Sequence, residues 1–221
     1  LIVINGINRW TLLSGVVFVV LVAIAVVLVG QYEHLPPVDE VAGFFGANAG
    51  RISTGGYVGT VAAFFLLWFA GSLRGVLRRT RVVDSSLADI AFGGVVAGAV
   101  LLAVAFSGLQ GMAMRVATGG IGADAVAVMN DSWSQMIGLA MPVAMAACCA
   151  ATGLVVVRTG LLPGWFGWLS VIIGVGLLTP LSYAVLALAI LWTGLLSLWL
   201  FARSGGEDAV PAVPTGAKSA A

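Results

Sequence analysis

Charged side chains are scarce in this sequence. Its 221 residues include 10 basic and 9 acidic side chains, and 61% of the residues are hydrophobic. A soluble globular domain carries roughly 25% charged residues, so the composition excludes a soluble enzyme domain. The formal net charge of +1 also provides no basic face for DNA or RNA. We therefore expect a membrane protein with no nucleic-acid partner.

Histidine and cysteine are nearly absent. The single histidine, His34, cannot supply both axial ligands of a b-type haem. Beside Glu33 it could act as a proton acceptor or pH sensor, although an isolated exposed histidine usually has no such role. Cys148 and Cys149 are adjacent in an uncharged stretch, where neither a disulfide framework nor a zinc site is plausible. No H-E-x-x-H, G-x-S-x-G or phosphate-binding glycine motif occurs. We expect no catalytic residue and no cofactor.

Several uncharged stretches are long enough to cross a membrane, which takes about 20 apolar helical residues. Charges are absent from residues 10–32, 52–73, 90–114, 132–157 and 159–202. The last stretch accommodates two crossings, with a turn at Thr179-Pro180-Leu181-Ser182. Pro142 removes one backbone donor and predicts a kink in its span. The sequence thus predicts an all-α, polytopic membrane bundle with six transmembrane helices, at about residues 11–30, 56–73, 87–112, 133–157, 163–179 and 182–202.

A short interfacial helix is predicted on the outward side, at about residues 37–46. Pro37 suits a first turn, and Asp39 and Glu40 favour the positive end of the helix dipole. Its apolar residues share one face: Val38, Val41, Phe44 and Phe45. Such a helix would lie along the membrane surface. Residues 1–203 then form one transmembrane domain, and residues 204–221, rich in Gly, Pro, Ala and Ser, are expected to be a disordered cytoplasmic tail.

The basic residues are distributed unevenly between the two sides of the predicted bundle. One side carries only Arg51 and Arg115, whereas the other carries Arg9, Arg74, Arg78, Arg79, Arg81, Arg158, Arg203 and Lys218. The positive-inside rule places the richer side, and with it both termini, in the cytoplasm. The dominance of Ala, Val, Gly, Leu and Arg suggests a high-GC bacterial genome, so we expect a bacterial plasma membrane protein.

Polar side chains collect at the outward ends of the third and fourth predicted spans. The candidate cluster comprises Gln110, Arg115, Asn130, Asp131 and Gln135. Polar residues within or next to a membrane span are candidate functional sites. We expect an Arg115–Asp131 ion pair here, in a small outward-facing pocket. The alternative is a structural cap that satisfies the helix ends.

All six methionines fall between Met112 and Met145 on the same two predicted spans. Thioethers are soft ligands for Cu(I), and Met112 and Met114 have the M-x-M spacing of copper-handling proteins. Methionine is also a flexible filler in helix packing, which is the simpler interpretation. We otherwise expect no metal site.

Small residues repeat at helix-packing spacing. Gly94 and Gly98 form a G-x-x-x-G pattern in the third predicted span, and Gly55 and Gly59 repeat it in the second. Such residues let helix backbones approach closely in lipid. They would pack helices within the chain, or against a second copy or another membrane protein.

The run from Ala151 to Leu169, followed by an apolar hairpin, resembles a family of six-helix integral membrane proteins of unknown function that is common in actinobacteria. It contains Leu162-Pro163-Gly164-Trp165-Phe166-Gly167-Trp168. Glu40–Phe45, Asn48–Arg51 and Asn130-Asp131 are also similar to the family's pattern. The resemblance implies six spans over about residues 10–203 and implies no activity. Independently, Pro163 suits a helix start, and Trp165 and Trp168 suit anchors at the headgroup level.

The sequence favours a non-enzymatic membrane component that is either an accessory subunit or a binder of lipid or another hydrophobic molecule. The alternative is a small transporter whose entrance is the polar cluster of the third and fourth spans. Methionine-based copper handling is a remote third possibility.

Overall fold

A computed structural model describes residues 9–30, 37–80 and 85–204, and over these ranges the secondary structure is all helical. The helices are α1 (Arg9–Leu12), α2 (Ser14–Val29), α3 (Val38–Arg78), α4 (Ser85–Ala117), α5 (Ala123–Gln135), the π-helical turn η1 (Met136–Ala140), α6 (Met141–Thr159), α7 (Gly164–Gly176) and α8 (Ser182–Ser204). The predictions for Glu33, His34, Arg81, Lys218 and residues 205–221 lie outside the described residues.

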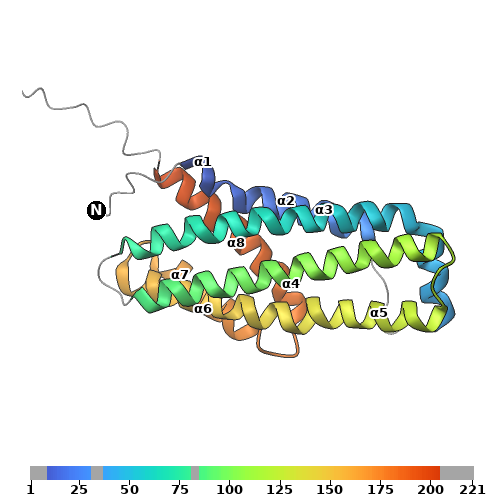
Figure 1. Cartoon of the computed structure of the whole chain (residues 1–221). Coiled ribbons are helices and arrows are strands. Elements are labelled where there is room, and N and C mark those ends of the chain that lie inside the picture. The colour runs from blue at the N-terminus through green and yellow to red at the C-terminus, as the bar shows by residue number, and fades with distance from the viewer. Residues whose placement is uncertain (1–8, 31–36, 81–84, 205–221) are drawn as a thin grey trace, which may run out of the picture.

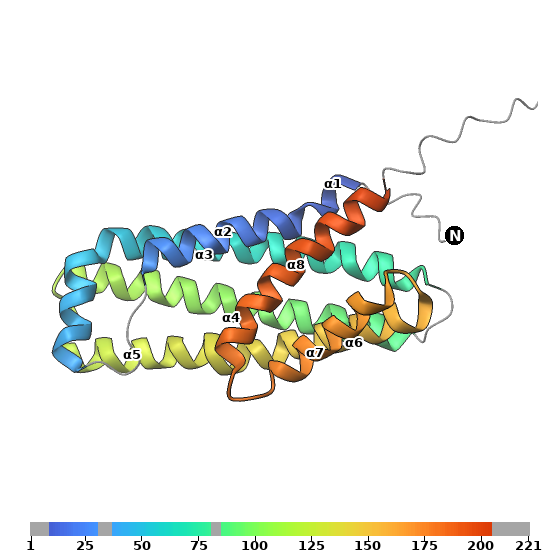
Figure 2. The ribbon, with the colours of Figure 1, turned by 180° about the vertical axis from the view of Figure 1, so that it is seen from behind.

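The long helices form an elongated antiparallel bundle. Helices α3 and α4 and the continuous rod α5–η1–α6 run along its length (Figure 1). Helix α2 lies along α3, α7 folds back along α6, and α8 crosses the bundle obliquely (Figure 2). The ends of the rod and of α4 therefore meet at the same two ends of the molecule.

Five helices of the described ranges are long and apolar enough to cross a membrane: Trp10–Val29, Val38–Arg78, Ser86–Ala117, Ala123–Thr159 and Ser182–Arg203. They indicate a membrane-embedded protein. The sixth predicted span, residues 163–179, is not confirmed, because α7 has only 13 residues and is about 20 Å long. Gly160, with φ of +64°, and Pro163 delay its start, and turn bonds at residues 176–179 end it.

The expected interfacial helix is the first part of α3. This helix bends sharply near its N-terminal end, so that its first turns run across the ends of α4 and α5 (Figures 1 and 2). Val41 and Phe45 are buried there and Phe44 is half-buried, whereas Val38 is exposed. The apolar face of this segment therefore packs mainly on the protein.

Glycines set the closest helix contacts. A methyl group added at Gly94 would lie 2.6 Å from the Ala144 carbonyl oxygen, and one at Gly98 would lie 3.1 Å from Met145 Sδ. Both neighbours belong to α6 of the same chain, so these glycines are not available to a second copy. A methyl group at Gly59 would overlap the Phe106 ring, so α3 also packs closely on α4.

Asp89 pairs with two arginines at the basic end of the bundle. Arg74 and Arg78 each lie 2.9 Å from its carboxylate oxygens and link the end of α3 to the start of α4. The arginine side chains are 38% and 47% exposed, so solvent weakens this attraction. Arg74 also lies over the Phe92 ring, at 4.8 Å from its centroid.

A buried polar contact attaches α7 to α8. Trp192 Nε1 donates to Ser170 Oγ at 2.8 Å, and the Ser170 hydroxyl donates to the Phe166 carbonyl, also at 2.8 Å. The Phe166 and Trp192 rings stack with centroids 6.2 Å apart. Their burial explains why so short a helix is held firmly in the bundle.

Candidate functional site

The irregular turn η1 follows from Pro142. In a regular α-helix, the N–H of residue 142 would donate to the carbonyl of Gly138, but proline has no N–H. The hydroxyl of Ser182 donates to the Gly138 carbonyl instead, at 2.7 Å. The Met141 N–H reaches back five residues to the Met136 carbonyl, which is the π-helical pattern. The irregularity predicted at Pro142 is thus a wide turn just before it.

Tyr183 secures the same turn. Its hydroxyl donates to the Ser134 carbonyl, and its ring lies so close to Gly138 that any Cβ there would overlap it. The start of α8 therefore contacts η1 through two neighbouring residues, Ser182 and Tyr183. Because π-helical turns often occur at functional sites, the surroundings of η1 are the first place to search.

An apolar groove lies between α4 and the α5–η1 part of the rod. Its volume is about 190 Å³. The lining residues are Val104, Ala105, Gly108, Leu109 and Met112 of α4, and Met129, Ser132, Trp133 and Met136 of α5 and η1. No atom lies within 4 Å of the position a Cβ would take at Gly108, so this glycine keeps the groove open.

The register between α4 and the α5–η1–α6 rod gives the length of the groove. Gly94 lies beside Ala144 and Cys148, and Phe106 lies beside Trp133, so residues at one level have numbers that sum to about 240. Met112 is therefore level with Met129 at one end, and Val104 is level with Met136 at the other. Eight residues separate these levels, so the groove is about 12 Å long.

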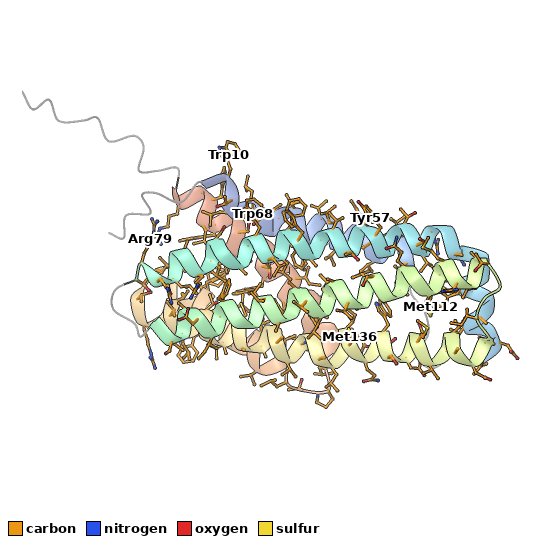
Figure 3. The ribbon with its side chains drawn as sticks, viewed as in Figure 1. Trp10, Tyr57, Trp68, Arg79, Met112 and Met136 are labelled. Atoms are coloured by element: carbon orange, nitrogen blue, oxygen red, sulfur yellow. The ribbon has the colours of Figure 1, made fainter. Side chains whose placement is uncertain are left out.

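Three of the six methionines line this groove: Met112, Met129 and Met136. Met112 and Met136 lie at different positions along the bundle (Figure 3), about 12 Å apart by the register. They cannot share one metal ion. The suggested copper pair also diverges, because Met112 is 1% exposed whereas Met114 is 58% exposed. Positions i and i+2 of a helix do not face each other.

Trp133, one of the lining residues, carries an unpaired polar atom. Its Nε1 atom is buried and has no hydrogen-bond partner among the described residues. The indole packs edge-to-face on Phe106, with ring centroids 6.3 Å apart and an interplanar angle of 78°. The other polar side chain of the lining, Ser132, donates its hydroxyl to the Val128 carbonyl of its own helix.

The predicted polar cluster does not converge on one point. Gln110 and Asn130 are level with each other, and both are at least partly buried. Arg115, Asp131 and Gln135 are exposed. The expected Arg115–Asp131 ion pair is wrong, since these two described side chains form no salt bridge with each other. None of the five residues lines the groove.

The two predicted interfacial anchors are exposed at the start of α7. Trp165 is 65% and Trp168 is 60% exposed. Nearby, Arg203 donates to the Leu161 carbonyl in the loop before α7. Trp10 and Arg79 lie at this same end of the bundle (Figure 3). The end thus combines exposed tryptophans with arginines.

Sequence reasoning missed the groove residues Gly108 and Trp133 and the Ser182 and Tyr183 contacts with η1. Pro142 was the available signal for the last two, since an internal proline leaves a carbonyl in need of a donor. The groove had no local signal, because it depends on how α4 and α5 are placed against each other.

No protein family matches the chain in a scan of family models, and no curated protein or solved structure matches it.

Proposed function

We propose that this chain is a six-helix integral membrane protein that binds the acyl chain of a membrane lipid in the groove between α4 and α5–η1. The observation that carries the proposal is the groove itself, which is apolar and open at Gly108. A 150 Å³ apolar cavity holds a molecule of about the size of benzene, and this groove measures about 190 Å³. It suits a short segment of hydrocarbon chain.

Helix lengths support a position for the outward boundary of the hydrocarbon core. Ser182 bonds to Gly138, which precedes Arg158 by 20 residues, and Tyr183 precedes Arg203 by 20 residues. Each distance is about 30 Å along a helix, which equals the hydrocarbon thickness. The turn between α7 and α8 would then reach the boundary opposite Arg158 and Arg203. On this basis α7 and its flanking turns make the sixth crossing.

The same measure supports a position of the groove close to that boundary. Leu109 follows Asp89 by 20 residues on α4, and Gly138 is level with about residue 102 of α4. The groove extends from the level of Val104 to that of Met112, so its inner part lies between these two estimates and its outer part lies beyond them. The parts of α3, α4 and α5 beyond it would project from the membrane.

Charge supports an orientation for the bundle. Arg74, Arg78, Arg158 and Arg203 are all at the end opposite the groove. The positive-inside rule makes this end cytoplasmic and the groove outward-facing. With six crossings, both termini lie in the cytoplasm, as expected for a bacterial plasma membrane protein of this orientation. Membership of the actinobacterial six-helix family would agree with this topology.

The structure does not favour the other two functions. A transporter entrance made from the polar cluster would need side chains that share a cavity, and those of Arg115, Asp131 and Gln135 are exposed. Copper handling would need thioethers around one point, whereas Met112 and Met136 line opposite ends of the groove and Met114 is exposed.

The test is to fill the groove. Gly108→Phe places a ring in the open space, and Gly93→Phe is its control, since Gly93 is also exposed on α4 with no atom near its Cβ position but lies outside the groove. Native mass spectrometry of each protein after gentle detergent extraction counts the bound lipids. We expect lipid on the wild type and on Gly93→Phe, and its loss from Gly108→Phe. Equal lipid retention by all three proteins would refute the proposal.

A further inference from the structure

The loop between α6 and α7 is bordered by two arginines from different helices. Arg158 lies in the last turn of α6, three residues before Leu161, and is exposed. Arg203, in the last turn of α8, donates a hydrogen bond to the Leu161 carbonyl, and its guanidinium lies 4.8 Å from the centroid of the Trp199 ring. These two contacts hold the Arg203 charge against the loop that Arg158 precedes.

Neither arginine is neutralised by a carboxylate of the described residues. Both salt bridges found there involve Asp89, which pairs with Arg74 and Arg78 and is the only acidic residue that the structure describes at this end of the bundle. A carbonyl oxygen and an aromatic ring orient a guanidinium, but they do not cancel its charge. Arginine has five N–H donors in a geometry that suits phosphate, and Arg203 uses one of them on Leu161. The loop can therefore bind an anion.

The face of α7 that follows this loop is apolar and exposed. Its residues occupy positions i, i+3, i+4 and i+7 on one side of the helix: Trp165, Trp168, Leu169 and Ile172. Tryptophan is enriched where headgroups meet acyl chains, and Leu169 and Ile172 lie farther from the loop. From the loop onward, this surface thus presents positive charge, then tryptophan, then hydrocarbon. A phospholipid presents its phosphate, glycerol and acyl chains in the same order.

We propose that this loop binds the phosphate of an anionic phospholipid through Arg158 and Arg203, while the acyl chains lie along the exposed face of α7. An anionic lipid is favoured over a zwitterionic one, because its headgroup supplies the negative charge that the described residues do not. This site goes beyond the lipid-binding function proposed above, since the groove between α4 and α5–η1 is at the opposite end of the bundle.

The experiment compares two lipids that differ only in the headgroup. Wild-type protein in detergent is titrated with phosphatidylglycerol and with phosphatidylcholine of identical chains, and binding is followed by native mass spectrometry. Binding in the groove depends on the chains, so it contributes equally to both lipids. The loop adds a preference for phosphatidylglycerol of about fivefold for each arginine, which decreases as salt is raised.

Variants assign this preference to the two arginines. Arg158→Gln should reduce the preference about fivefold, and so should Arg203→Gln, whereas Arg203→Lys should keep it because the charge remains. Arg115→Gln is the control, since it removes an exposed arginine at the other end of the bundle. Arg158 makes no hydrogen bond or salt bridge with the described residues, so Arg158→Gln decides the question even if Arg203→Gln fails to fold.

The outcomes separate this site from the groove and from a free anion site. Equal wild-type binding of the two lipids, or a preference that Arg158→Gln leaves unchanged, would overturn the inference. Inorganic phosphate at the lipid concentration should not displace phosphatidylglycerol, because it has no chains to lie on α7; displacement would assign the loop to a free anion instead. Gly108→Phe should retain the preference, and its loss in this variant would place the preference in the groove and overturn the inference.

Discussion

Replacing Gly138 by alanine should disrupt the contact between η1 and the start of α8. The added methyl group would overlap the Tyr183 ring, so the ring must move away. That movement weakens two hydrogen bonds, from Tyr183 to the Ser134 carbonyl and from Ser182 to the Gly138 carbonyl. Gly138→Ala therefore tests whether the α7–α8 turn holds the irregular turn in place.

The size of the effect follows from three contributions. Overpacking in a close contact costs about 1–3 kcal/mol. Each side-chain hydrogen bond in a membrane protein contributes about 0.6 kcal/mol on average, hence about 1.2 kcal/mol for two. Alanine is the better helix former by about 1 kcal/mol, which offsets part of the loss. The expected net loss in the free energy of unfolding is about 1–3 kcal/mol.

The assay is reversible unfolding in mixed micelles at increasing denaturing-detergent fraction, followed by circular dichroism. Gly93→Ala is the matched control, because it makes the same change on an exposed helix position with nothing near; it should be neutral or stabilising by up to about 1 kcal/mol. In a Tyr183→Ala background the Gly138→Ala change should cease to destabilise. If Gly138→Ala is as stable as the wild type, or equally harmful without the tyrosine ring, the reasoning is refuted.

Three further predictions concern the polar contacts and the orientation of the bundle. Asp89→Asn removes the charge that pairs with two arginines and should lower the free energy of unfolding most at low salt. The control Asp131→Asn, at an exposed position, should change stability little. An equal loss of stability in both variants, or a loss in Asp89→Asn that does not depend on salt, contradicts the pairing. Ser170→Ala removes the acceptor of the buried Trp192 Nε1 and should cost about 1–3 kcal/mol in the unfolding assay; a loss under a few tenths would show that this bond is unimportant. In a background without native cysteines, a membrane-impermeant maleimide added to whole cells should label Asp131→Cys and leave Gly164→Cys unlabelled, and the reverse pattern would invert the proposed orientation.

The arrangement of charges was sufficient to predict most of the fold. Uncharged stretches predicted long apolar helices, because a charge inside the hydrocarbon core is expensive, and the structure has five of them in its described ranges; two, Val38–Arg78 and Ala123–Thr159, extend well beyond the predicted spans. The stretch after Arg158 was harder, since its length allows two crossings while Gly160, Pro163 and Pro180 shorten the helix between them. The structure has a 13-residue α7 there, so hydropathy alone overestimated the length of that helix.

The candidate site was less predictable. Proximity in sequence correctly placed Arg115 and Asp131 at one end of the bundle, yet it does not specify helix faces, and both side chains are exposed. Asp89 was overlooked as a partner for Arg74, because these arginines read as ordinary positive-inside loop charges. Gly108 and Trp133 come together only through the antiparallel packing of α4 and α5, which no short sequence pattern encodes.

The π-helical turn also determines which way the two halves of one helix face. A regular α-helix advances about 100° per residue, so the one extra residue in a π turn rotates everything after it by about 100°. Trp133 and Met145 would otherwise be about 120° apart around the rod, but the extra residue brings them to within about 20° of each other. Both can then face α4, where Trp133 contacts Phe106 and Met145 lies beside Gly98. The turn thus changes the rotation of the rod between its two halves. It allows one face of α4 to pack closely on α6 and to form an open groove with α5.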